Sequence, residues 1–167
     1  MKTLVYGMQS SGASYITWRL SQDPNTISVL DLCCHAAPTS LHDESENYDV
    51  IMKCVANTMH SFDEIVETFQ PDVKILVTRN MDDIVKSLEQ KSYRNDAGTI
   101  PQKIEVFENV VKKYGPYFDK VIAYEDIVKE PFEPTRSVEE IVEFNSTNSE
   151  WCRNNYRVMW GIGGIHA

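Results

Sequence analysis

The first twenty residues constrain the fold more than any other stretch of the chain. Residues 2–6 are a short apolar run, residues 7–14 form a small polar segment bounded by glycines, and residues 15–20 carry apolar side chains at helical spacing. This pattern predicts a strand, a loop and a helix in succession. Backbone N–H groups in such a loop converge on one point, which also faces the positive end of the helix dipole. The opening therefore predicts a binding site for phosphate or sulfate.

The loop has the spacing of a P-loop but lacks the lysine of that motif. Four residues separate Gly7 from Gly12, and Ser14 follows two positions later, so the pattern reads G-x-x-x-x-G-A-S. Ala13 stands where nucleotide triphosphatases place the lysine that reaches the β and γ phosphates. The pattern favours an anion-binding loop over an ATPase or GTPase. The alternative interpretation is a turn of small residues that binds nothing.

Strands and helices alternate along the rest of the chain. Apolar, β-branched runs predict further strands at residues 26–30, 48–52, 73–78 and 120–124, and helical spacing of apolar residues occurs between most of them. The segment between the second and third strands is rich in charge and is predicted to be irregular. Alternation of this kind implies parallel strands covered by helices on both faces. The sequence predicts a single α/β domain over residues 1–167, three-layered, with a central parallel sheet of about five strands.

The overall charge limits the partners of the chain. Sixteen basic and 25 acidic residues give a net charge of -9, which argues against general binding of nucleic acid or of an anionic membrane surface. The sequence shows no secretory signal pattern and no apolar run of membrane-spanning length. We therefore expect a cytoplasmic protein in which any anionic ligand is held by local geometry.

Two basic residues lie where predicted strands end. Lys53 follows the third strand and Arg79 follows the fourth. Because the carboxyl ends of parallel strands share one edge of the sheet, both side chains are expected near the opening loop, over a single polyanionic ligand. The alternatives are a solvent-exposed lysine at position 53 and an ion pair from Arg79 to Asp82 or Asp83.

Three segments resemble the sulfotransferase family. Residues 77–87, with Arg79 and Ser87, resemble the R-N-P-x-D-x-x-x-S stretch that grips the 3′-phosphate of the donor 3′-phosphoadenosine 5′-phosphosulfate (PAPS), although Met81 replaces the proline and the aspartate is shifted. The opening loop resembles the P-K-S-G-T-T-W motif that holds the 5′-phosphosulfate, with Tyr15 in the position of the tryptophan that stacks on adenine. Residues 124–127 resemble the Y-E-D-L that follows a later strand. The resemblance implies a P-loop NTPase-like sulfotransferase fold.

The chain departs from the family at positions that matter for catalysis. Ser10 replaces the lysine or arginine that contacts the leaving-group oxygen, and a neutral hydroxyl cannot supply that charge. Lys53 resembles the lysine of the family's K-T-H tripeptide and is the best substitute, but the histidine that acts as base there is missing. His35 and His60 are the candidate bases, with Glu44 as a third, because some members use a glutamate after the second strand. A surface or packing role is the alternative for each histidine.

The resemblance implies a complete set of expectations about function. PAPS would be the donor, its desulfated form PAP the product and a small molecule the acceptor, with no metal and with a homodimer as one way to complete the acceptor site. A late segment with Arg157 would close over the 3′-phosphate; the alternative is an aromatic tail packed on the sheet or on a second subunit. A binding protein without catalysis, favoured by the missing cation at position 10, and a nucleotide kinase, disfavoured by Ala13, are the other functions considered. The predicted catalytic residues are Lys53, His60 and His35, and the predicted donor-binding residues are Ser10, Ser11, Gly12, Ala13, Ser14, Tyr15, Arg79, Ser87 and Arg157.

Overall fold

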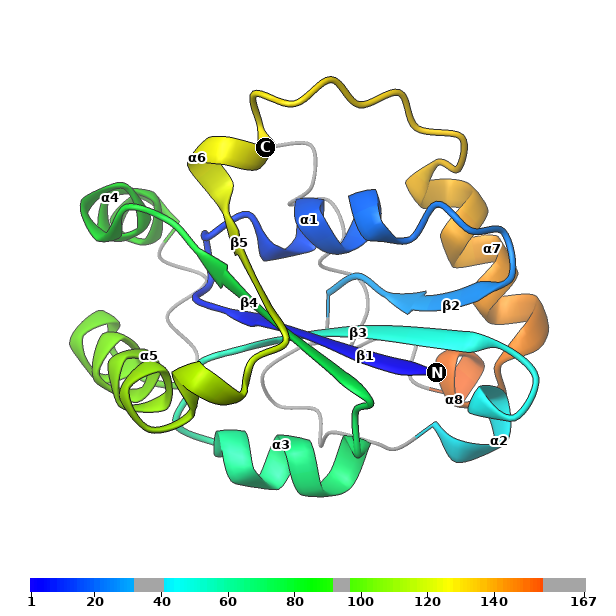
Figure 1. Cartoon of the computed structure of the whole chain (residues 1–167), viewed down its shortest axis with the longest axis horizontal. Coiled ribbons are helices and arrows are strands. Elements are labelled where there is room, and N and C mark those ends of the chain that lie inside the picture. Colours follow the sequence, from blue (N-terminus) through cyan, green and yellow to red (C-terminus); the bar gives the residue numbers. More distant parts are fainter. Residues whose placement is uncertain (32–40, 92–96, 155–167) are drawn as a thin grey trace.

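The computed structural model describes residues 1–31, 41–91 and 97–154 (Figure 1). Five strands form one sheet, all of whose paired neighbours are parallel, in the order β2-β3-β1-β4-β5. This confirms the prediction of an α/β fold with a five-stranded parallel sheet. The strands are β1 (Lys2–Gly7), β2 (Thr26–Val29), β3 (Asp49–Val55), β4 (Val73–Thr78) and β5 (Lys120–Ala123).

Helices follow the strands, and several begin at side-chain caps that the sequence supplies. Ser61, Asn80, Thr99 and Ser137 each accept a hydrogen bond from the backbone N–H three residues later. No helix in the described ranges has the length and apolar character needed to span a bilayer. The helices are α1 (Ala13–Leu20), α2 (His42–Ser45), α3 (Phe62–Phe69), α4 (Met81–Gln90), α5 (Ile100–Tyr114), the 3-10 turn η2 (Gly115–Tyr117), α6 (Tyr124–Ile127), α7 (Val138–Asn148) and α8 (Glu150–Asn154).

Successive residues of each central strand face opposite layers of helices. On β1, Leu4 and Tyr6 pack into the larger core, which the apolar faces of α3, α4 and α5 complete, whereas Val5 packs against α1 in a second core. Figure 1 shows α1 and α3 on opposite sides of the strands. The fold is therefore three-layered. Side chains at alternate positions of a central strand pack against opposite layers of helices.

The structure corrects several of the sequence predictions. β3 extends to Val55 rather than ending at residue 52, because Cys54 and Val55 pair with the last residues of β1. Lys53 consequently lies inside the strand and not after it. β5 ends at Ala123, since Tyr124 begins α6, and the segment predicted to be irregular contains the short helix α2.

Asn145 on α7 completes the hydrogen bonding of the edge strand β2. Its Oδ1 accepts from the Ser28 N–H at 3.1 Å, and its Nδ2 donates to the Ser28 carbonyl at 2.8 Å, with the Asn145 side chain buried. We expect Asn145→Ala to lower the free energy of unfolding by about 2 kcal/mol, because it leaves two buried backbone groups unsatisfied. Chemical denaturation measures this, with the exposed Thr147→Ala on the same helix as control. Equal stability of the two variants would contradict the assignment.

Candidate anion-binding site

The loop between β1 and α1 is shaped by two residues with left-handed backbone angles. Ser10 has φ 64° and Gly12 has φ 83°, and Ser11 between them turns inward. The Ser11 N–H and Oγ both donate to the Met8 carbonyl, at 3.2 and 2.6 Å, so this serine builds the loop rather than facing a ligand. Alternating backbone conformations of this kind form a concave nest of N–H groups.

The first turn of α1 leaves its N–H groups available to a ligand. Ile16 makes the first backbone bond of the helix, to the Gly12 carbonyl at 2.9 Å. Within the ranges that the structure describes, the N–H groups of Gly12, Ala13, Ser14 and Tyr15 donate no hydrogen bond, and no side chain caps the helix. Four N–H donors at the positive end of a helix dipole favour a bound anion.

Arg79 and Ser87 meet at the same residue of this loop. The Arg79 Nη1 donates to the Ser10 carbonyl at 2.7 Å, and the Ser87 Oγ donates to the Ser10 Oγ at 3.1 Å. Arg79 follows β4, and Ser87 lies two turns into α4. Both side chains therefore reach the loop from this one strand-to-helix segment. The two motifs that the sequence analysis linked therefore share one site, while their roles in binding a donor stay predictions.

The guanidinium of Arg79 does not form the alternative ion pair. Among the described residues, no carboxylate lies within 4.0 Å of it, and neither Asp82 nor Asp83 reaches it. Asp83 instead presents its backbone N–H to the Asn80 side chain in the cap of α4. Within the part of the chain that the structure describes, the charge of Arg79 thus lies at the loop with no carboxylate at ion-pair distance.

Tyr124 fixes the position of Arg79 relative to the loop. The Arg79 guanidinium carbon lies 4.5 Å from the centroid of the Tyr124 ring, a cation–π distance. A Cβ at Gly12 would lie 2.4 Å from Cδ2 of that ring. The ring therefore packs against Gly12 and Arg79, and only a glycine admits this approach.

Glu125 ties the start of α4 to the end of β5. Its Oε1 accepts from the Asn80 N–H at 2.6 Å. This bond is the main reason that the pKa of Glu125 lies below its usual value. A hydrogen bond from the N–H of Glu125 itself and the nearby positive charge of Arg79 lower the pKa further, whereas desolvation of the carboxylate raises it.

Acid should release the link between Glu125 and Asn80. A carboxyl whose pKa is lowered by folding contributes stability above its unfolded-state pKa and loses that contribution as the pH falls through its folded-state pKa. We expect the Glu125 carboxyl to titrate below an ordinary glutamate, and the Asn80 amide proton to shift over the same pH range. An NMR titration measures both. Titration of Glu125 at or above the pH of an ordinary glutamate would contradict the bond.

Lys53 reaches the loop from the middle of β3. It lies two residues after Ile51 and so faces the α1 layer, with its side chain 7% exposed. Its Nζ lies 3.1 Å from the Ser14 Oγ and 2.7 Å from the Asp31 Oδ1. Lys53 and Arg79 thus both contact the loop, at Ser14 and at Ser10. Asp31 is a partner that the sequence analysis missed.

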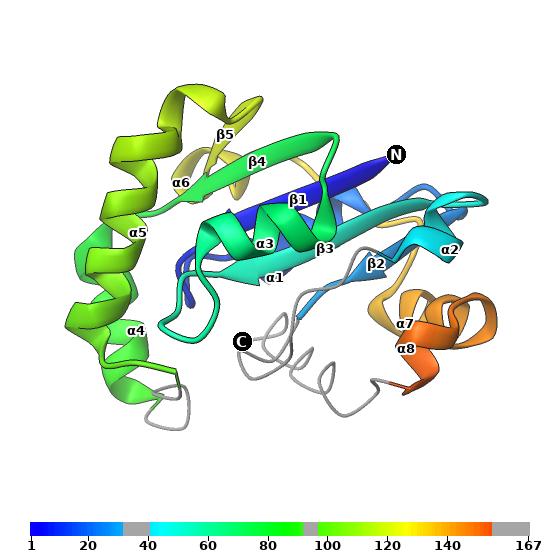
Figure 2. The same cartoon turned by 90° about the horizontal axis from the view of Figure 1, so that it is seen from below.

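Lys103 is a second residue of the site that the sequence analysis missed. It lies on the buried face of α5 with Phe107 and Val110, is 0% exposed, and its Nζ donates to the Gln9 Oε1 of the loop at 2.8 Å. Figures 1 and 2 show α4 and α5 beside each other at the end of the sheet where β1 and β4 end. A lysine at an apolar position of a helix was the signal that could have found it.

Tyr15 and Glu44 are engaged in local packing. The Tyr15 ring contacts Trp18 and Phe132 edge-on, and its hydroxyl accepts from Arg19 at 3.3 Å. The Glu44 carboxylate accepts from the Ser149 hydroxyl and the Trp151 N–H, and so helps to hold α8. The Glu44 carboxylate is therefore engaged with α8 and not with the loop, and Glu44 is a poor candidate for the base.

Of the candidate histidine bases, His60 makes no contact to the loop in the described ranges. His60 Nδ1 lies 3.3 Å from Glu64 on α3, and its buried Nε2 has no partner among the described residues. His35 and Arg157 lie outside the described residues. Their predicted roles, like that of His60, stay predictions.

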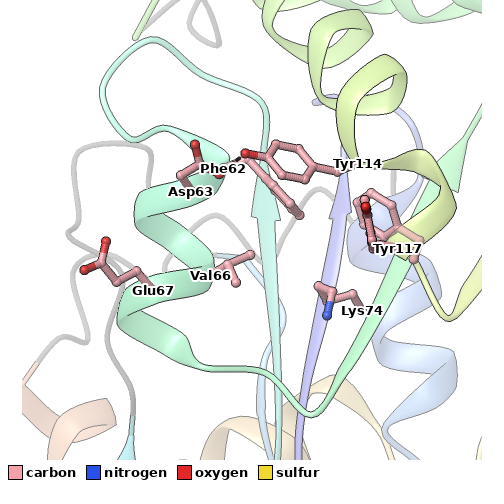
Figure 3. Close-up of a pocket in the computed structure, with 8 residues that line it drawn as sticks. Phe62, Asp63, Val66, Glu67, Lys74, Tyr114 and Tyr117 are labelled. Carbon is pink, nitrogen blue, oxygen red and sulfur yellow. Dashed lines mark hydrogen bonds between the residues drawn. The ribbon is translucent and has the colours of Figure 1, made fainter.

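A separate pocket of about 200 Å³ lies at the other end of β4 (Figure 3). Lys74, the second residue of β4, borders it, whereas Arg79 follows the last. Tyr114 donates a hydrogen bond to the Asp63 carboxylate at its rim, and Glu67 adds a second acid. Aromatic walls and two carboxylates do not suit a phosphate, so this pocket is not the anion site.

Comparison with protein-family models and with curated proteins gives no match for this chain. The interpretation of the site therefore depends on its geometry and on the motifs that it brings together.

Proposed function

We propose that this chain is a PAPS-dependent sulfotransferase of the P-loop-like fold, which moves a sulfuryl group to a hydroxyl or amine of a small acceptor. The observation that supports this most is that Arg79 and Ser87 both bond to Ser10. A ligand bound over this loop can place one anionic group on the backbone N–H donors and a second anionic group on the Arg79 guanidinium. PAPS carries such a pair, a 5′-phosphosulfate and a 3′-phosphate.

In the proposed complex, both anionic groups of the donor have partners. The 5′-phosphosulfate takes the free N–H groups of residues 12–15, and the 3′-phosphate takes the Arg79 guanidinium and the Ser87 hydroxyl in place of their bonds to Ser10. Charge-assisted bonds to a phosphate are stronger than the bond from Arg79 to a backbone carbonyl, so this exchange favours binding.

The proposed reaction is an in-line displacement at sulfur. The acceptor oxygen or nitrogen forms a bond to sulfur while the bond from sulfur to the bridging phosphate oxygen breaks, and PAP leaves with that electron pair. The Lys53 ammonium beside Ser14 stabilises the charge that develops on the leaving phosphate. The acceptor proton passes to a base, for which His35 and His60 are the candidates.

A protein that holds PAPS or PAP without catalysis is the second candidate. Two observations favour it: position 10 carries a neutral serine, and the charge of Lys53 is shared with Asp31. Both reduce the positive charge available to a leaving group.

Donor turnover separates these two functions. Radiolabelled PAPS is incubated with the protein and a mixture of phenols, alcohols and amines, and transfer of label is measured for the wild type and for Lys53→Ala. The sulfotransferase proposal predicts labelled product from the wild type and at least a tenfold lower rate from the variant. Donor binding without any transfer across the mixture would leave only the binding protein.

A further inference from the structure

The pocket beside the start of β4 has aromatic walls that the fold already holds in place (Figure 3). The Phe62 ring contacts those of Tyr114 and Phe118, with ring centroids 5.1 and 5.5 Å apart. Tyr114 also donates its hydroxyl to the Asp63 carboxylate, which ties α5 to α3 across the rim. Walls that are packed before a ligand arrives lose little conformational freedom when it binds. The pocket is therefore suited to a flat apolar group.

Hydrogen bonds between β4 and the chain after η2 hold Lys74 at this pocket. The Lys74 N–H donates to the Asp119 Oδ2 at 2.8 Å, and the Asp119 N–H donates to the Lys74 carbonyl at 2.8 Å. Val73 and Ile75, on either side of Lys74, pack in the core of the α1 layer. Because successive residues of a strand face opposite ways, Lys74 faces the layer of α3 and α5. It borders the pocket there with its side chain half-buried.

Two opposite charges border the pocket and are not paired with each other or with another described residue. Glu67 reaches the rim from α3 and Lys74 from β4. Within the described ranges, neither side chain has an oppositely charged group within 4.0 Å. Asp63 differs because it accepts the Tyr114 hydroxyl, and the Lys113 ammonium lies 5.0 Å from the centroid of that tyrosine ring. A ligand can therefore meet one acid and one base at the rim without breaking an ion pair.

The position of Glu67 favours a bound cation. Glu67 lies in the last turn of α3, where the helix dipole disfavours a negative charge, and that turn contains no basic residue. Asp63, four residues earlier, adds a like charge on the same face of the helix. An ammonium group bound beside Glu67 relieves both effects. The positive end of a ligand is therefore expected on the α3 side, and a negative end beside Lys74.

We propose that this pocket binds a small zwitterion that carries an aromatic group, which is the chemistry of a free aromatic amino acid. The ring of the ligand lies between the aromatic walls, its ammonium pairs with Glu67, and its carboxylate pairs with Lys74. The pocket and Arg79 lie at opposite ends of β4. The inference therefore does not depend on the proposed function.

An NMR titration of the isotope-labelled chain tests this proposal with three matched probes. L-Phenylalanine carries both charges, phenethylamine lacks the carboxylate, and hydrocinnamate lacks the ammonium. The backbone amides of Lys74 and Phe118 report binding at the pocket, and those of Ala13 and Ser14 report binding at the loop after β1. The position of the shifts thus identifies the site, and their concentration dependence gives the affinity.

The wild type should bind L-phenylalanine with a dissociation constant in the millimolar range, as expected for a ligand of this size. Each analogue should bind about threefold more weakly, because an ion pair at an exposed rim contributes little. Glu67→Gln should lose the preference for L-phenylalanine over hydrocinnamate and keep the preference over phenethylamine. Lys74→Gln should show the reverse pattern. Glu105→Gln, which removes an exposed acid from α5, should match the wild type.

Several results would overturn the proposal. Equal affinity of the wild type for the three probes would show that the charges at the rim play no part, and unchanged preferences in both variants would show the same. Shifts at Ala13 and Ser14 alone, or with no probe at all, would place the ligand elsewhere or reject it. Shifts at Lys74 and Phe118 that grow with protein concentration alone would assign the pocket to a second copy of the chain. A thermal melt of each variant establishes that it is folded.

Discussion

An Arg79→Ala variant is expected to bind PAP more weakly than the wild type by about tenfold to a hundredfold, because a charge-assisted bond to a phosphate contributes roughly 1.5 to 3 kcal/mol. The guanidinium lies at the loop, 2.7 Å from the Ser10 carbonyl, without a carboxylate within 4.0 Å among the described residues. It can thus bond a ligand phosphate without first breaking an ion pair. Calorimetry with PAP measures the loss directly.

Two companion variants make that result specific. Arg79→Lys keeps the charge but loses the fork geometry and should show a loss of about tenfold. Lys86→Ala removes an exposed lysine from α4, the helix that follows Arg79, and should leave the affinity unchanged. Equal effects of Arg79→Ala and Lys86→Ala would show that only the general positive charge near this end of the sheet matters, and the assignment of Arg79 would then be wrong.

Gly12→Ala is expected to destabilise the fold by about 3 kcal/mol and to abolish detectable anion binding. The new Cβ would lie 2.4 Å from the Tyr124 ring and would sit on a residue with φ 83°. Relief of the clash moves the Tyr124 ring, and with it the Arg79 guanidinium that stacks on it. Denaturant unfolding and calorimetry measure the two losses.

Gly115→Ala provides the matched control for this change. Gly115 has φ -46°, and a Cβ there would meet no atom within 4 Å, so this variant should be neutral or slightly stabilising. Wild-type stability in Gly12→Ala would contradict the packing of Tyr124 against the loop.

The strands and helices whose ends are set by neighbouring residues in the sequence were predictable. The run at residues 73–78 coincides with β4, because a β-branched segment follows Pro71 and precedes the cap at Asn80. The length of β3 was not predictable, since Lys53 and Cys54 read as a strand end until their pairing with β1 is known. Asn80, a residue type that favours helix N-caps, caps α4, and Asp82 and Asp83 lie in its first turn, where the helix dipole favours acids.

The site was predictable only where residues are close in sequence or carry a motif. The loop at 7–14, Arg79 and Ser87 came from spacing and resemblance. Asp31 and Lys103 reach the loop from other elements, and a single acid after a strand or a single lysine on a helix does not indicate which distant segment it will contact. The packing of Tyr124 on Gly12 and Arg79 joins three distant segments, which no local pattern encodes.

Binding of PAP, measured by calorimetry beside ATP and GTP, tests the central claim most directly. That claim is that the loop and Arg79 grip the two ends of one adenosine bisphosphate. PAP is then expected to bind in the micromolar range or tighter, and neither triphosphate is expected to bind detectably. Binding of ATP or GTP in preference to PAP would contradict the claim.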